Sequence, residues 1–275
     1  MVPMDGVWVQ NSRKRDIGLK KVLKVLKWVI VTLVALAVVF AIGFKIYVGN
    51  YYKTDEETVS SIASNLDNSV NSYTDDNGMV FLPEGQDYKA VIVFYPGGKV
   101  EYTAYSGLMY ELADRGYICV LSRMPENLAF LKINAVEGMK NDHAEETDTV
   151  KDLDCYLAGH SLGGVAASLF LNEASDEYKG LILCASYPNA DLSNMDIRFL
   201  SILGSEDKVI KKDAYDNAKA YWPKDSEEHI IDGGIHSYFG CYGIQSGDGK
   251  PTISNEEQIV KTADIIEQWI EKGAD

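Results

Sequence analysis

The chain has 275 residues, of which 46% are hydrophobic, a length and composition that suit one large globular domain with an appendage. The net charge of −15 is uneven, since residues 1–45 carry eight Lys or Arg against two Asp, which leaves −21 on the remainder. An acidic body of this kind lacks the basic patches that nucleic acid requires, so we expect no nucleic-acid partner. The four cysteines lie far apart without a Cys-x-x-Cys or Cys/His cluster, so they predict small core residues and no metal site, while a disulfide stays open.

An apolar segment near the N-terminus predicts a membrane span. The 17 residues from Trp28 to Phe44 carry no charge, and Ile46–Val48 extends the run to about 20 residues, enough for one crossing. Lysines precede the segment and acidic residues follow it, which places the N-terminus in the cytoplasm and the large domain outside. The alternative is a cleaved signal peptide, because Ala41-Ile-Gly43 is a small-x-small site.

The chain divides into four expected parts. Residues 1–27 form a basic cytoplasmic tail, residues 28–48 a transmembrane anchor, residues 49–77 a polar juxtamembrane spacer and residues 78–275 the large domain. Within the spacer, a juxtamembrane helix is expected at 55–66.

Within the large domain, short apolar runs alternate with amphipathic segments. This alternation predicts an α/β domain whose mostly parallel sheet is covered by helices on both faces. Large lids are often inserted between the strands that are expected here at 180–185 and 197–203. Only about ten residues, 186–195, separate these two strands, so we expect no large lid. Strands are expected at 79–82, 89–95, 117–121, 155–158, 180–185, 197–203 and 228–231, and helices at 102–115, 127–139, after residue 164, at 211–222 and from a capping box at 254–257 to about 272, with an acidic turn or helix at 142–152.

The segment Gly159-His160-Ser161-Leu162-Gly163 lies between an apolar strand and a helical pattern. A serine on such a tight strand-to-helix turn has a strained backbone, and glycines two positions away avoid side-chain clashes. This context predicts a nucleophile elbow, with Ser161 as the nucleophile at a helix N-terminus. The other interpretation is that the glycines only let a helix pack closely on the sheet.

Two later strands are followed by residues that could complete such a site. Asp207 lies in the loop after one strand, with Glu206 and Asp191 as rival acids, and His236 lies in the glycine-rich loop after the last strand. The order Ser161, Asp207, His236 is the one that a Ser-His-Asp triad follows in this type of domain. A solvated acidic loop and an idle loop histidine are the alternatives.

The first of the long apolar strands is followed by Pro96-Gly97-Gly98. Glycines at this point leave backbone N–H groups free to approach a ligand. Together with the Leu162 N–H, the Gly97 and Gly98 N–H groups are expected to form an oxyanion hole. An ordinary turn is the alternative.

Several short motifs between roughly residues 78 and 272 resemble those of one known group of proteins. They are Phe94-Tyr-Pro-Gly-Gly-Lys-Val-Glu101, Arg123-Met-Pro125 with Asn127-Leu-Ala-Phe130, Gly159-His-Ser-Leu-Gly-Gly164, Ala185-Ser-Tyr-Pro188, Gly204-Ser-Glu-Asp207 and Gly247-Asp-Gly249 with Thr252-Ile-Ser254. The chain resembles the α/β-hydrolase superfamily, and within it the dienelactone-hydrolase-like bacterial group with an N-terminal membrane segment.

This resemblance implies Ser161 as nucleophile, Asp207 as acid and His236 as base, with no metal or organic cofactor. Dienelactone hydrolases proper use cysteine where this chain has Ser161, so dienelactone is not the expected substrate. The histidine motif also departs from the group's pattern, with Ile235 and Ser237-Tyr238 where Asn and Ala-Gln are expected.

The expected function is hydrolysis of a small ester, lactone or thioester through an acyl-enzyme at the membrane surface. An acyltransferase or peptidase on the same fold is one alternative, and a non-catalytic, membrane-tethered binding domain is another.

Overall fold

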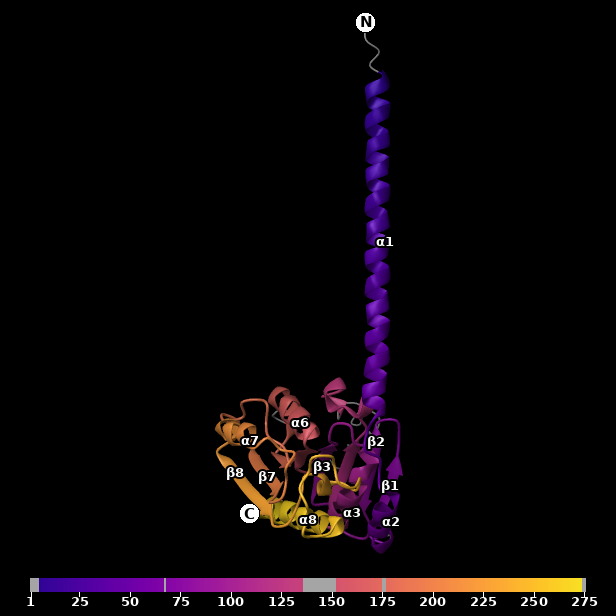
Figure 1. Ribbon diagram of the computed structural model, residues 1–275. Coiled ribbons are helices and arrows are strands. Elements are labelled where there is room, and N and C mark those ends of the chain that lie inside the picture. Colours follow the sequence, from indigo (N-terminus) through magenta and orange to yellow (C-terminus); the bar gives the residue numbers. More distant parts are fainter. Residues whose placement is uncertain (1–4, 67, 136–151, 175–176, 274–275) are drawn as a thin grey trace. The chain divides into compact units, whose positions relative to one another are not determined.

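The computed structural model describes residues 5–66, 68–135, 152–174 and 177–273, with side chains from Lys21 onward (Figure 1). The chain divides into two compact units, Met1–Asn50 and Tyr51–Asp275.

The first unit is one continuous helix, α1 (Asp5–Gly49). Its stretch Lys21–Gly49 is long and apolar enough to cross a membrane, a test that a signal sequence at this position also passes. Large apolar side chains are exposed all around it, Phe40 by 75% and Ile46 by 71%. A helical stretch that is apolar on every face is a candidate membrane span.

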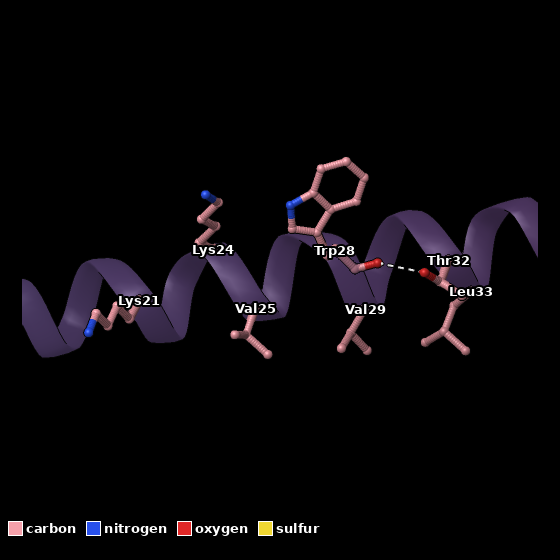
Figure 2. Close-up of a pocket in the computed structure, with 7 residues that line it drawn as sticks. All are labelled: Lys21, Lys24, Val25, Trp28, Val29, Thr32 and Leu33. Carbon is pink, nitrogen blue, oxygen red and sulfur yellow. Dashed lines mark hydrogen bonds between the residues drawn. The ribbon is translucent and has the colours of Figure 1, made fainter.

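Figure 2 shows the transition from the basic to the apolar part of α1. Lys21 and Lys24 precede Trp28, and all seven residues drawn come from this one helix, so the hollow between them is a groove along its surface. The Thr32 hydroxyl donates to the Trp28 carbonyl at 2.9 Å. Because this bond satisfies the hydroxyl, the Thr32 side chain is compatible with an apolar environment.

The second unit is built on an eight-stranded sheet with the order β1-β2-β4-β3-β5-β6-β7-β8. The pairs β1–β2 and β2–β4 are antiparallel, and all pairs from β4 to β8 are parallel. The expected mostly parallel sheet is therefore confirmed. The strands are β1 (Val70–Thr74), β2 (Gly78–Pro83), β3 (Ala90–Tyr95), β4 (Tyr117–Ser122), β5 (Cys155–His160), β6 (Gly180–Cys184), β7 (Arg198–Gly204) and β8 (Asp225–Ile231).

Helices cover both faces of this sheet. Alternate residues of the central strands point to opposite sides, so each strand contributes side chains to the cores on both faces. In β3, Ile92 and Phe94 join one core cluster, which α3 and α8 also enter, while Val93 and Tyr95 join the cluster of α6. The helices are α2 (Glu56–Asn65), α3 (Ser106–Asp114), α6 (Leu162–Glu173), α7 (Lys212–Ala218) and α8 (Asn255–Lys272), with short 3₁₀ turns η1 (Tyr102–Tyr105), η2 (Pro125–Asn127), η3 (Ala129–Leu131), η5 (Lys219–Tyr221) and η6 (Ser237–Phe239).

The last helix begins as its sequence predicts. Ser254 Oγ accepts the Glu257 N–H at 3.1 Å, and a Glu257 carboxylate oxygen accepts the Ser254 N–H at 3.1 Å. This reciprocal capping box satisfies two donors that a helix N-terminus leaves open. α8 then buries Ile259, Ala263, Ile266 and Trp269 against the sheet, so it is firmly fixed where it passes the loop after β8.

The structure differs from the sequence expectation before residue 78. Helix α2 lies where the juxtamembrane helix is expected, at 55–66, but the stretch after it, expected as a spacer, contains β1, and the compact unit begins at Tyr51. Strand β1 pairs with β2 from Val70–Pro83 to Thr74–Met79. It is an edge strand with half its side chains in solvent, so its sequence is polar and resembles a linker.

A second difference follows β4. The expected helix at 127–139 is replaced at its start by η2 and η3, because Glu126 and Asn127 have φ of 53° and 55°, which a helix cannot contain. The rest of that helix and most of the acidic segment 142–152 lie outside the described residues. The connection from β6 to β7, residues 185–197, is described in full and contains no helix, so no helical lid is inserted there.

Candidate active site

Ser161 lies on the turn between β5 and α6 with φ 50° and ψ −121°. A backbone of this kind costs about 1–3 kcal/mol and persists only where the surroundings fix it. The Ser161 N–H donates to the Cys184 carbonyl at 3.0 Å, and the Ser161 carbonyl accepts the Ser186 hydroxyl at 2.6 Å, so the end of β6 holds the turn.

The glycines on either side of this turn are required by close packing. A Cβ on Gly163 would lie 2.2 Å from the Tyr95 carbonyl oxygen, and one on Gly159 would lie 2.6 Å from the Gly164 nitrogen. Any side chain at either position would push the helix off the sheet. The structure therefore places the predicted elbow residues in the strand–turn–helix geometry that exposes a serine hydroxyl at the sheet edge.

His236 and Asp207 meet at the same edge of the sheet. His236 Nδ1 lies 2.8 Å from Asp207 Oδ2, and both side chains are 2% exposed. The other carboxylate oxygen accepts the N–H groups of Val209 and Ile210 at 2.8 and 2.9 Å. Since the carboxylate accepts from Nδ1–H, the lone pair of the imidazole is on Nε2, the tautomer that a general base needs.

His236 Nε2 is buried and has no hydrogen-bond partner among the described residues. The His236 ring lies 4.7 Å from the ring of His160, the residue directly before Ser161, so the imidazole stands beside the elbow. No hydrogen bond joins Ser161 Oγ to Nε2 within the described part of the chain. Such contacts are commonly long in unliganded sites and shorten when substrate binds.

The two rival acids lie elsewhere. The Asp191 carboxylate is exposed, and hydrogen bonds from Ser193 lower its pKa. A Glu206 carboxylate oxygen accepts from Ser205 Oγ at 3.4 Å. Of the three acids considered from the sequence, Asp207 is the one that binds the His236 ring in the described residues.

Two residues that sequence reasoning did not assign to the site hold the histidine loop. Asp248 accepts the Ser237 N–H at 2.8 Å and the Ser237 hydroxyl at 2.5 Å, and its other oxygen accepts the His236 and Lys208 N–H groups at 3.4 Å. The buried Gln258 of α8 accepts the Ile235 N–H at 2.9 Å and donates to the Ile235 carbonyl at 2.8 Å. These bonds hold the loop that bears His236 and connect it to the loop that bears Asp207.

A buried chain of hydrogen bonds links the loop after β3 to the loop after β8. The Gly97 N–H donates to Tyr105 Oη at 3.0 Å, Tyr105 Oη lies 2.8 Å from His160 Nδ1, and His160 Nε2 lies 3.1 Å from the His236 carbonyl oxygen. A carbonyl can only accept, so His160 Nε2 donates and Nδ1 accepts the Tyr105 hydroxyl proton. We call this chain the Tyr105–His160 relay.

His160 is neutral in this position. Burial lowers its pKa well below the ordinary value, and the proximity of His236 lowers it further. Burial raises the pKa of Tyr105, so its hydroxyl keeps its proton. Both protonation states agree with the hydrogen-bond directions of the relay.

The relay changes the set of expected oxyanion donors. The Gly97 N–H is occupied by Tyr105 Oη, and the Lys99 N–H donates to the Asn127 carbonyl at 2.7 Å, so neither faces the elbow unpaired. The Gly98 and Leu162 N–H groups have no acceptor in the described part of the chain. A Cβ on Gly98 would lie 2.5 Å from Leu162 Cδ2, so these two residues adjoin each other. Of the three N–H groups expected as oxyanion donors, those of Gly98 and Leu162 are unpaired in the described residues, whereas that of Gly97 is not.

None of the four cysteines forms a disulfide bond, and three of them are buried. Burial raises the pKa of Cys184 and of Cys241 to about 12, so both thiols are protonated at neutral pH and inert. Among the described residues, no group of three or more His, Cys, Asp or Glu is arranged to hold a metal ion.

The strand order and the strained serine turn define the class of this domain as the α/β-hydrolase fold. A model described as alpha/beta hydrolase family matches residues 91–260, more than half of the chain, and the chain belongs to that family. A comparison with curated proteins gives no match. The family match confirms the superfamily that the motifs resemble, while the dienelactone-hydrolase-like group within it stays a proposal.

Proposed function

We propose that the chain is a serine hydrolase that cleaves a small ester, lactone or thioester by way of an acyl-enzyme. The single observation that carries this proposal is the buried His236–Asp207 pair, whose free Nε2 lies beside the strained turn of Ser161. A hydrolase of the alpha/beta hydrolase family needs a base of this tautomer next to its nucleophile.

In the proposed reaction, His236 Nε2 takes the proton of the Ser161 hydroxyl as its oxygen attacks the substrate carbonyl. Asp207 holds the imidazole through Nδ1 and stabilises the imidazolium that forms. The Gly98 and Leu162 N–H groups donate to the oxyanion, and donors of this kind are worth about 3–4 kcal/mol each. His236 then returns its proton to the leaving group, and water, activated by the same imidazole, releases the acyl group from Ser161.

The short β6–β7 connection favours a small substrate, because it contributes no helical cap to the site. The motifs quoted above support a place in the dienelactone-hydrolase-like group, with Ser161 in place of that group's cysteine. Helix α1 supports anchoring in the cell membrane by a single span, and the lysines before Trp28 support a cytoplasmic N-terminus and an extracytoplasmic domain.

Labelling with a fluorophosphonate probe and turnover of p-nitrophenyl acetate test the proposal. The wild-type chain in detergent is expected to be labelled and to hydrolyse the ester. Ser161→Ala should lose both, with unchanged circular dichroism, whereas Ser193→Ala, a serine of the β6–β7 loop, should retain both. An unlabelled wild type would favour the non-catalytic binding domain, and rapid transfer to added alcohols or cleavage of peptides would favour the acyltransferase or the peptidase.

A further inference from the structure

The first residues of the compact domain form hydrogen bonds with the loop that follows β3. The Tyr52 N–H donates to the Lys99 carbonyl at 2.8 Å, and the Glu101 N–H donates to the Tyr52 carbonyl at 2.9 Å. Tyr52 and Val100 thereby form an isolated parallel β-bridge. We call Tyr52–Asp55 the strap.

Side chains reinforce this attachment. The Thr54 N–H donates to a Glu101 carboxylate oxygen at 3.0 Å, and the Thr54 and Thr103 hydroxyls share a hydrogen bond of 2.6 Å. The strap is thus bound on one side along the whole loop 99–103 that follows Gly98.

On its other side the strap contacts the segment that follows the histidine loop. The Asp55 N–H donates to the Cys241 carbonyl at 2.8 Å, and Tyr52 Oη accepts the Ser246 N–H at 3.0 Å. The Tyr52 and Tyr242 rings lie 5.7 Å apart. The same segment returns to the base, because the Gln245 N–H donates to Ser237 Oγ at 2.8 Å. The strap therefore joins the two loops that bear Gly98 and His236.

The loop 97–101 needs external support. Lys99 has φ 60°, a left-handed conformation that a lysine adopts only under constraint. Two of the constraints on this residue are the bond from its N–H to Asn127 and the bond to its carbonyl from the strap. Because Gly98 precedes Lys99 directly, the orientation of the Gly98 N–H depends on this fixed geometry.

We propose that the strap is a positioning element of the active site, which holds the Gly98 N–H in line for the oxyanion. The inference rests on the proposed function. It extends the site to residues before the family-matched region 91–260, only three positions after α1 ends at Gly49. The segment that leaves the membrane helix is therefore a working part of the catalytic centre as well as a tether.

The test uses the full-length chain in nanodiscs and compares variants at single positions of the strap. Tyr52→Pro deletes the N–H that binds the Lys99 carbonyl, and Lys53→Pro is the matched control, because the Lys53 N–H has no acceptor in the described residues. Tyr52→Ala removes the same side chain, with its ring contact to Tyr242 and its bond from Ser246, but keeps both backbone bonds. The readouts are kcat and KM for p-nitrophenyl acetate and the inhibition constant of an alkyl boronic acid, whose tetrahedral adduct needs the oxyanion donors.

We expect Tyr52→Pro to lower kcat at least tenfold and to weaken boronate inhibition in proportion, with KM within threefold and an unchanged pH profile of kcat/KM. Lys53→Pro changes a residue with no backbone hydrogen bond in the described part of the chain, so its kcat should stay within about threefold of the wild-type value. Tyr52→Pro should have a kcat at least threefold below that of Tyr52→Ala, and equal kcat values in these two variants would overturn the role of the backbone bond. Should Tyr52→Pro fail to fold, Thr54→Val serves instead, with kcat lowered twofold to fivefold at constant KM.

Wild-type kcat in a folded Tyr52→Pro chain would overturn the proposal, as would an equal loss in Lys53→Pro, and so would an unchanged Thr54→Val where that variant is used. A wild-type chain that neither hydrolyses esters nor labels at Ser161 would overturn the proposed function, and the positioning role with it. An active wild type with unaffected strap variants overturns the strap alone.

Discussion

The Tyr105 hydroxyl donates to His160 Nδ1 at 2.8 Å, and this bond makes the residue before the proposed nucleophile a link between two loops. On one side of the pair, Tyr105 Oη receives the Gly97 N–H; on the other, His160 Nε2 donates to the His236 carbonyl. All members of the relay are buried, so the exchange of any bond for water is unfavourable. The loop of the proposed oxyanion hole and the loop of the proposed base are thereby fixed relative to one another.

Tyr105→Phe is expected to lower kcat for a short ester about tenfold. The substitution leaves the Gly97 N–H and His160 Nδ1 without partners, at a cost of about 1–3 kcal/mol in the free energy of unfolding. It also releases the loop that bears Gly98, so transition-state stabilisation falls while KM changes little. Steady-state kinetics and urea unfolding measure the two effects separately.

Tyr215→Phe is the matched control for this change. Tyr215 is also buried, and its hydroxyl forms hydrogen bonds of 2.7 Å with Ser201 and with Glu228, away from the relay. A comparable loss of stability with nearly wild-type kcat is expected. Equal losses of kcat in both variants would mean that Tyr105 acts only through stability.

Asp207→Asn is expected to lower kcat by orders of magnitude, while Asp191→Asn leaves it within about twofold. An amide at position 207 stabilises the imidazolium less and can bind the wrong tautomer of His236, an effect that reaches about 10⁴-fold in serine proteases. Asp191 offers a fair control because it also follows a strand but its carboxylate is exposed and binds Ser193. A large loss at Asp191 with none at Asp207 would reverse the assignment.

The sequence predicts the central part of this fold well, for a physical reason. Buried parallel strands such as β3 and β6 are continuous apolar runs, and the glycines around Ser161 are required because a Cβ at Gly163 would lie 2.2 Å from the Tyr95 carbonyl oxygen. Both features can therefore be recognised in the sequence. Edge strand β1 is half exposed and polar, and its pairing with β2 leaves no such pattern. The sequence pattern also fails for the helix expected after β4, because the left-handed backbone conformation of Glu126 is incompatible with a helix, whatever the helix propensity of the residues around it.

The candidate site divides in the same way. Ser161, Asp207 and His236 could be proposed as site residues because the sequence alone shows that each follows a predicted strand and gives their order along the chain. Asp248 and Gln258 could not be assigned, since an aspartate in a glycine-rich loop and a glutamine in a helix are ordinary residues until the fold brings them to the histidine loop. Occupation of the Gly97 N–H by Tyr105 likewise depends on a contact eight residues away.

Protease added outside intact cells should digest the domain that begins at Tyr51. The lysines before Trp28 favour a cytoplasmic N-terminus, because basic flanks stay on the cytoplasmic side of a single span. An N-terminal epitope tag should survive on a fragment of about the first 50 residues, alongside an intact cytoplasmic marker protein. A domain protected until the cells are lysed would mean the opposite orientation.

The domain is expected to lose stability as the pH falls below about 6.5, because of His160. Burial keeps the folded-state pKa of His160 well below its ordinary value, whereas in the unfolded chain it binds a proton near pH 6.5. The unfolded state therefore holds more protons between these two values, and the free energy of unfolding rises with pH across this window. The contribution is complete above pH 6.5 and declines on acidification by about 1.4 kcal/mol per pH unit.

Urea unfolding between pH 7.5 and 5.0 measures this slope. His160→Gln replaces the imidazole by an amide that does not titrate, so it should lower stability at pH 7.5 but reduce the slope by about one proton. If His160→Gln retains the full wild-type slope, another group is responsible for the acid sensitivity, and the neutral His160 assigned to the relay loses its support.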